Sequence, residues 1–135
     1  MKTNIQRINP DGLLKNSAFS QIITTQGNGK TIYIGGQNAV NENREIIGKG
    51  DIKSQTEQVM KNIQTALSAC NATFDDVIKL NINIVQGQNA YDAFITSQKF
   101  MNSANPPAIT VLFVSGLMNP DFLLEIEATA FVGEE

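Results

Sequence analysis

The stretch VIKLNINIV, residues 77–85, decides how the chain folds, because its apolar residues recur at every second position. Successive side chains of a β-strand point to opposite faces of the sheet. The apolar members therefore share one face and the polar members share the other: Ile78, Leu80, Ile82 and Ile84 against Lys79, Asn81 and Asn83. This alternation predicts a strand whose apolar face is covered by helices and whose polar face is left open.

A second strand follows in NPPAITVLFVSGL, residues 105–117, and both of its faces are nearly all apolar. Ile109, Val111 and Phe113 point one way, whereas Leu112 and Val114 point the other way. A chain of 135 residues covers one face of a sheet with its own helices. The remaining apolar surface therefore indicates contact with further copies of the chain, in a closed symmetric oligomer.

Two amphipathic helices are predicted, one before each of these strands. The first begins at Asp51, and its apolar stripe recurs at helical spacing as far as Cys70. Asp51 or Ser54 can cap it, since Ser54 also has a glutamate three residues later. The second helix is expected over residues 90–103 and ends at a Pro-Pro step.

Further strands complete an α+β order of three strands, a helix, a strand, a helix and two strands. They are expected at residues 2–8, 19–25, 31–36 and 123–132, with a short piece near 45–47. The segment QGNGK between 19–25 and 31–36 is typical of a hairpin turn. Right-handed crossovers then place both helices on one face of a single sheet. We interpret residues 1–135 as one domain.

The composition excludes several classes of protein. Ten basic and thirteen acidic residues give a net charge of −3, and the sequence contains no basic cluster for binding nucleic acid. There is no histidine and one cysteine, so neither a disulfide within the chain nor a thiolate metal site is expected. No apolar run approaches the length of a membrane helix, and the first residues lack an apolar leader. We expect a cytoplasmic protein that does not bind a membrane.

Two features of the sequence can carry chemistry. Glu125 and Glu127 lie two residues apart in the last strand and so share a face. One of these carboxylates can orient a water or accept a proton in a pocket, or both can lie on a solvated strand face. Gly36 follows a strand, where a glycine either exposes backbone N–H groups to a ligand or forms a bulge.

An ordered set of short matches covers nearly the whole chain. It consists of Phe19-Ser20-Gln21, Gly36-Gln37, Gln55-Thr56 through Asn62-Ile63, Val77-Ile78-Lys79, Pro107-Ala108 and Glu125-Ile126-Glu127-Ala128. On these residues the chain resembles the RidA family, also called the YjgF or L-PSP family. The resemblance implies a chorismate-mutase-like fold and a homotrimer whose three sheets form a barrel. It also implies a small-molecule pocket at each subunit interface.

The resemblance further implies an activity that needs no cofactor or metal. Active members hydrolyse reactive enamine and imine intermediates to 2-keto acids and ammonia. Glu125 matches the family's water-positioning glutamate, and Gly36 matches its backbone binding site. Phe19 stands where the family usually has a tyrosine. Ile109 stands where the family has the arginine that pairs with the substrate carboxylate, and Val111 follows it along the pocket wall.

The absence of this arginine decides between the functional hypotheses. A bidentate contact with a carboxylate is worth roughly 1.5–3 kcal/mol, and Lys79 and Lys99 are the nearest basic residues in sequence. We favour a small-molecule-binding RidA-type trimer without efficient 2-imino acid deaminase activity. The alternative is a deaminase acting on 2-iminobutanoate or 2-iminopropanoate that holds its substrate differently, so whether the chain is an enzyme stays open. An endoribonuclease is less favoured, because the chain is acidic and lacks histidine.

Overall fold

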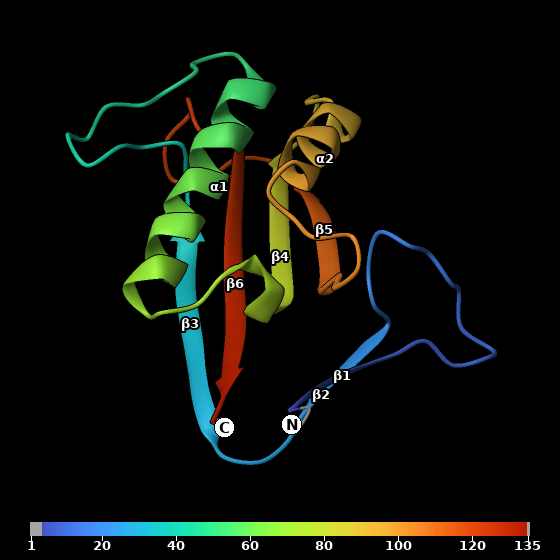
Figure 1. Cartoon of the computed structure of the whole chain (residues 1–135). Coiled ribbons are helices and arrows are strands. Elements are labelled where there is room, and N and C mark those ends of the chain that lie inside the picture. The colour runs from blue at the N-terminus through green and yellow to red at the C-terminus, as the bar shows by residue number, and fades with distance from the viewer. Residues whose placement is uncertain (1–3, 135) are drawn as a thin grey trace.

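The computed structural model describes residues 4–134 and places two helices against a four-stranded sheet (Figure 1). The strands are β1 (Ile5–Ile8), β2 (Ile22–Thr25), β3 (Gly29–Gln37), β4 (Val77–Val85), β5 (Ala108–Val114) and β6 (Leu124–Gly133). The helices are α1 (Ile52–Ala69) and α2 (Ala90–Gln98), and a 3-10 turn, η1, spans Phe74–Asp76. The predicted α+β order is confirmed. Within residues 4–134, no helix is both long enough and apolar enough to cross a bilayer.

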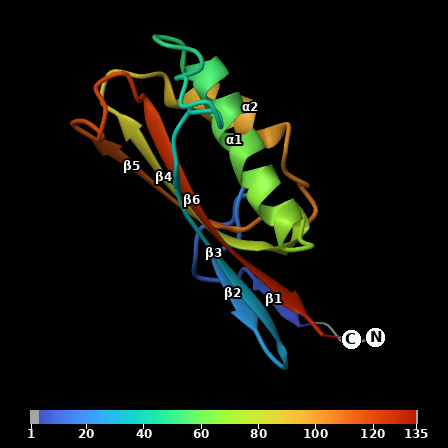
Figure 2. The same cartoon turned by 90° about the vertical axis from the view of Figure 1, so that its left-hand side faces the viewer.

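The strand order in the larger sheet is β3-β6-β4-β5. β6 runs antiparallel to both of its neighbours, β3 and β4, whereas β4 and β5 are parallel and are connected through α2. Both helices lie on the same side of this sheet (Figure 2). The prediction that two helices cover one face is therefore confirmed, and the other face is left open.

Strand β4 has one face covered by the helices and one open polar face, as its alternating sequence predicts. Leu80 and Ile84 are buried on the helix-covered face. On the open face, Lys79 Nζ donates to Thr110 Oγ1 at 2.7 Å. The strand shows one irregularity, a shift in its pairing with β6 between Val77 and Lys79, and this shift allows Val77 to be fully buried as well.

β5 forms the edge of the sheet and is apolar on both faces. Its parallel register sets Ile109 beside Leu80 and Val111 beside Ile82, so Ile109 and Val111 point to the helix side. Leu112 pairs with Asn83 and points to the open face. Val111, Leu112 and Phe113 remain about half exposed, as expected for an edge strand that other parts of the same chain cover incompletely.

The predicted hairpin between residues 19–25 and 31–36 is wrong. β2 pairs with β1 in a separate two-stranded ribbon, and β3 pairs with β6 (Figure 1). Strand β3 carries the buried Ile32 and Ile34, which pack in register with Ala130 and Ala128 of β6. This long-range pairing buries more apolar surface than a local turn at QGNGK can. The residues Lys2 and Thr3 of the predicted first strand lie outside the described residues.

The ends of the two helices differ in part from those predicted from the sequence. Asp51 caps α1 by accepting from Lys53 N at 3.1 Å. Ser54 is not the cap, because its hydroxyl donates to Asp51 Oδ2 at 2.7 Å, and this bond lowers the pKa of Asp51. α2 ends at Gln98 rather than at residue 103. Phe100 N donates to Ser97 O, a contact three residues back, so the chain tightens into turns there.

Gln55, a fully buried residue of α1, ties two loops to the helix layer. Its amide nitrogen donates to Gly48 O at 3.2 Å and to Asp121 O at 2.9 Å. Its amide oxygen accepts from Leu123 N at 2.9 Å. A single side chain thus pairs three backbone groups and fixes the point at which the chain enters β6.

We predict that Gln55→Leu destabilises the fold by about 3 kcal/mol, because it leaves buried backbone groups unpaired. The measurement is the free energy of unfolding from urea titration. Gln64→Leu, at an exposed position of the same helix, is the matched control and is expected to change stability by less than about 0.5 kcal/mol. Equal effects of the two substitutions would contradict the bridging role of Gln55.

Candidate functional site

A hollow near the predicted site residues lies beneath α2, on the helix-covered face of the sheet. It has a volume of about 640 Å³, which is within the range of small-molecule sites. Its lining comes from residues 16–19, both helices and strands β4, β5 and β6. Phe19, Ile109 and Val111 all line it, so the structure brings three of the predicted site residues together.

The lining of this hollow is apolar and uncharged. The apolar side chains of β4, β5 and β6 form its floor: Leu80, Ile82, Ile84, Ile109, Val111, Leu124 and Ile126. Its polar members are all neutral: Asn16, Ser17, Thr56, Tyr91, Ser97 and Gln98. Neither basic residue near in sequence belongs to the lining, since Lys79 bonds Thr110 on the open face and Lys99 follows the end of α2.

Two walls of the hollow are joined by Ser20, which is 2% exposed. Its backbone N–H donates to Pro107 O at 2.9 Å, and its hydroxyl donates to Pro106 O at 2.6 Å. The N-terminal ribbon adds a further bond, from Arg7 Nε to the same Pro106 oxygen at 3.3 Å. Ser20 is adjacent to Phe19, and Pro107 lies two residues before Ile109. These bonds therefore hold the Phe19 wall against the start of β5.

Gly36 and Glu125, the other two predicted site residues, lie together on the open face. The register of β3 shifts between Ile34 and Gln37, which forms a bulge at Gly36. A Cβ atom at Gly36 would lie 2.7 Å from Glu125 Cδ, so a larger residue there would require the Glu125 side chain to move. Glu125 pairs in register with Asn83 of β4. Within one chain, the carboxylate and the apolar hollow are thus on opposite faces of the sheet.

Glu127 shares the open face with Glu125 but has a local partner. Asn81 Nδ2 donates to Glu127 Oε1 at 3.0 Å, and these two residues are paired in register between β4 and β6. Across residues 4–134, no group of three or more aspartate, glutamate, cysteine or histidine side chains is arranged to hold a metal ion.

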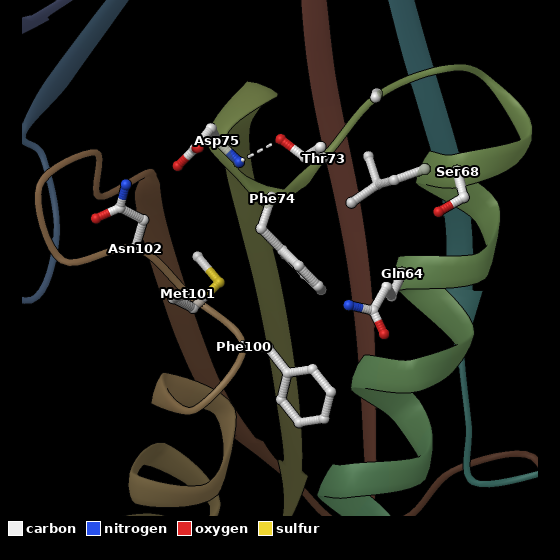
Figure 3. Close-up of a pocket in the computed structure, with 10 residues that line it drawn as sticks. Gln64, Ser68, Thr73, Phe74, Asp75, Phe100, Met101 and Asn102 are labelled. Carbon is white, nitrogen blue, oxygen red and sulfur yellow. Dashed lines mark hydrogen bonds between the residues drawn. The ribbon is translucent and has the colours of Figure 1, made fainter.

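A second hollow, of about 300 Å³, lies between the C-terminal half of α1 and the segment that follows α2 (Figure 3). The rings of Phe74 and Phe100 meet there with centroids 6.1 Å apart. Thr73 Oγ1 accepts from Asp75 N at its rim. Its lining shares no residue with the larger hollow and includes none of the predicted site residues. We therefore place the candidate site in the larger hollow.

Sequence analysis did not identify Thr56, Ser97 and Tyr91 as site residues. Thr56 and Ser97 lie on the buried stripes of α1 and α2, where they count as core positions by spacing alone. The available signal was their polarity, since a hydroxyl on an otherwise apolar helix stripe requires a partner. Tyr91 lies at the start of α2 and is 69% exposed.

Comparison with known proteins places this geometry in a family. The family model described as Endoribonuclease L-PSP matches residues 12–132. A RutC family protein of Pyrococcus horikoshii is 33% identical over 113 residues, which are 84% of this chain and 86% of that protein. The crystal structure of YyfB, a Rid family protein from Yersinia pestis, has a TM-score of 0.86 at 35% identity and covers 96% of this chain and all of its own. RidA from an Antarctic Psychrobacter shares the fold, with a TM-score of 0.70 at 21% identity, over 97% of this chain and 100% of that one.

We predict that Ser20→Ala destabilises the fold by about 1–2 kcal/mol, because the Pro106 carbonyl loses its short bond to the hydroxyl. Urea unfolding measures the change. Ser17→Ala, at an exposed position of the same loop, is the control and is expected to be nearly neutral. A Ser20→Ala protein as stable as the control would show that the hydroxyl does not hold the wall.

Proposed function

Because the chain belongs to the RidA/YjgF/L-PSP family, we propose that it is a homotrimer that binds small molecules in pockets at its subunit interfaces and lacks efficient 2-imino acid deaminase activity. The observation that carries the proposal is the position of Ile109. This residue lines a hollow whose described lining is entirely uncharged. The hollow therefore favours a neutral, mainly apolar ligand.

The argument against deaminase activity is energetic. A 2-imino acid carries a carboxylate, and moving an unpaired charge into an apolar site costs several kcal/mol. Arginine would offset this cost with two parallel charge-assisted hydrogen bonds. Isoleucine offers none, and Lys79 is engaged on the other face of the sheet. A phenylalanine at position 19, in place of the family's tyrosine, removes a further polar contact from the same hollow.

The argument for an interface rests on the two separated groups of site residues. Gly36 and Glu125 lie on the open face, whereas Phe19 and Ile109 lie on the helix-covered face near the β5 edge. In a closed oligomer the open face of one copy can approach the β5 edge of the next, so that both groups contribute to one pocket. The half-exposed Leu112 gives this edge an apolar surface to bury.

A working deaminase is the second candidate, and one observation favours it. Gly36 and Glu125 are in close contact, as a water-positioning carboxylate beside a backbone binding site would require. This arrangement leaves the hydrolytic half of the family's chemistry available. The missing element is the group that would hold the substrate carboxylate.

We predict that the native protein does not accelerate hydrolysis of the imine that a serine or threonine dehydratase releases. The assay follows trapping of the imine by semicarbazide, with which an active deaminase competes. Ile109→Arg is expected to raise kcat/KM by roughly 10- to 100-fold over background, the equivalent of one bidentate charge-assisted contact. Ile109→Leu is the matched apolar control and should remain inactive.

Each outcome of this assay decides something. Competition by the native protein would overturn the proposal and favour the deaminase. Activity in Ile109→Arg alone would show that residue 109 sets the substrate class. Inactivity of every variant would show that replacing residue 109 does not restore the family's activity, and would contradict the predicted gain.

The homotrimer gives a further prediction. Sedimentation should yield three times the 14.7 kDa mass of one chain. Leu112→Glu places a charge at the edge of the open face and is expected to shift the protein to monomers at micromolar concentration. Met118→Glu, at a residue that is 95% exposed in a loop, is the control and should leave the assembly intact. A native monomer would contradict the proposed assembly.

A further inference from the structure

The smaller of the two hollows lies outside the site described above and is accessible from solvent. Its walls come from the C-terminal half of α1, from η1 and from the segment that follows α2 (Figure 3). Gln64 is exposed, Phe100 and Met101 are partly exposed, and Phe74 is 7% exposed. The volume of about 300 Å³ is at the lower end of the range for small-molecule sites. A ligand can therefore reach this lining, provided that it is small.

Hydrogen bonds of the main chain hold both walls of the smaller hollow in place. Thr73 and Asp76 form a capping box that fixes η1, in which Asp76 Oδ2 accepts from Thr73 N at 2.9 Å. On the other wall, Phe100 N donates to Ser97 O at 3.1 Å. The walls are therefore formed before a ligand binds, and this lowers the entropic cost of binding.

The interior of the smaller hollow favours a flat aromatic ring. The rings of Phe74 and Phe100 are tilted by 58° and have centroids 6.1 Å apart. Met101 adds a thioether sulfur to the same lining (Figure 3). Aromatic rings are stabilised by tilted or offset contacts with other rings, and a thioether sulfur makes favourable contacts with ring edges. A saturated body of the same size lacks both kinds of contact.

Gln64 supplies a polar contact to this interior. Its side chain points from α1 toward the two phenylalanine rings (Figure 3). A carboxamide has an NH₂ group that donates and an oxygen that accepts. The partner that matches both ends is another amide, because an amide can accept from the nitrogen and donate to the oxygen at the same time.

The charge in the lining is negative and lies to one side. Asp75 is the charged member, and the other lining residues are neutral. Figure 3 shows its carboxylate on the side of Asn102, away from Gln64. There Asp75 Oδ1 accepts from Asn105 Nδ2 at 3.3 Å. An anionic ligand would find no cationic partner in this lining, so the hollow favours a neutral molecule.

We propose that the smaller hollow is a second binding site, which takes a small neutral aromatic molecule with an amide group. The ring packs against Phe74, Phe100 and Met101, and the amide pairs with Gln64. This site shares no lining residue with the larger hollow. The inference therefore goes beyond the proposed function and does not depend on it.

NMR of methionine methyl groups locates binding at this site. Met101 lines the smaller hollow, whereas none of the residues that line the larger hollow is a methionine. The full-length native protein is isotope-labelled at these methyl groups, and the spectrum of Met101→Leu identifies the Met101 signal. Met118, which is 95% exposed in a loop, is the internal control and should not respond.

Three probes separate the ring from the amide: benzamide, methyl benzoate and cyclohexanecarboxamide. Benzamide should shift the Met101 signal with a dissociation constant of about 1 mM, as expected for a molecule of its size. The ester cannot donate a hydrogen bond, and the saturated amide has no aromatic ring. Each of these two is expected to bind about fivefold more weakly than benzamide.

Substitutions assign the contacts. Gln64→Leu is expected to remove the preference for benzamide over methyl benzoate, since leucine pairs with neither. Thr65→Val is the matched control, at an exposed neighbouring position of α1 outside the lining, and should keep the preference. Ile109→Arg alters the larger hollow and should leave the Met101 response unchanged. Urea unfolding curves exclude misfolded variants.

The outcomes separate this inference from the proposed function. No shift of the Met101 signal at millimolar benzamide overturns the second site, and so does a shift that Ile109→Arg abolishes. Equal binding of amide and ester, or a preference that survives Gln64→Leu, overturns the pairing with Gln64. Equal binding of cyclohexanecarboxamide overturns the aromatic requirement. None of these results bears on the larger hollow, which the imine-trapping assay tests separately.

Discussion

The alternation of side chains along β6 is the constraint on which the rest of the structure depends. Leu124 and Ile126 must be buried under the helices, because they form the centre of the core and part of the floor of the hollow. Every second residue then points the other way. Glu125 is consequently placed on the open face, although its neighbours in sequence line the hollow. The Glu125 carboxylate is one residue away from the lining of the hollow along the chain, but the thickness of the sheet separates it from the hollow.

Because Glu125 and the hollow lie on opposite faces of the sheet, ligand binding and hydrolysis would require different numbers of chains. The proposed binding of a neutral molecule would use the hollow, which one chain forms from its own helices and strands. Hydrolysis by Glu125 needs the carboxylate to reach a molecule bound against Ile109, and a second chain has to supply one of the two. In the assembly proposed above, hydrolysis would therefore require two chains, whereas one chain supplies the apolar part of the pocket by itself. The half-exposed edge of β5 is an apolar surface that such an assembly would bury.

The parts of the fold that follow from periodicity could be predicted from the sequence. β4 matches residues 77–85 to the residue, and α1 begins directly after Asp51. The predicted hairpin at QGNGK failed because strand pairing is decided by apolar surface buried at long range, and local turn signals do not report it. Strand β3 pairs with β6 because this pairing buries the isoleucines of β3, and β2 pairs with β1 instead.

For the candidate site as well, the sequence identified some residues and missed others. The family resemblance identified Ile109 and Phe19, and the structure places both in one hollow. Thr56 and Ser97 could not be assigned a role from spacing, because a hydroxyl on a buried stripe reads as core. In the structure, Thr56 Oγ1 donates to Ile52 O and Ser97 Oγ donates to Phe94 O, and these bonds depend on the folded backbone, which residue spacing does not describe.

Phe19 and Ile109 are the two lining residues at which this chain differs from the family pattern, and the two differences have a common effect. Each removes a polar group relative to the family pattern, and the two residues face the same space. An arginine at position 109 would lie beside Leu80 and above an apolar floor, where its charge would depend on a bound anion for compensation. Isoleucine needs no such partner, so the empty hollow carries no buried charge. Both differences therefore act in one direction, because together they leave the lining that a single chain supplies without a charged group.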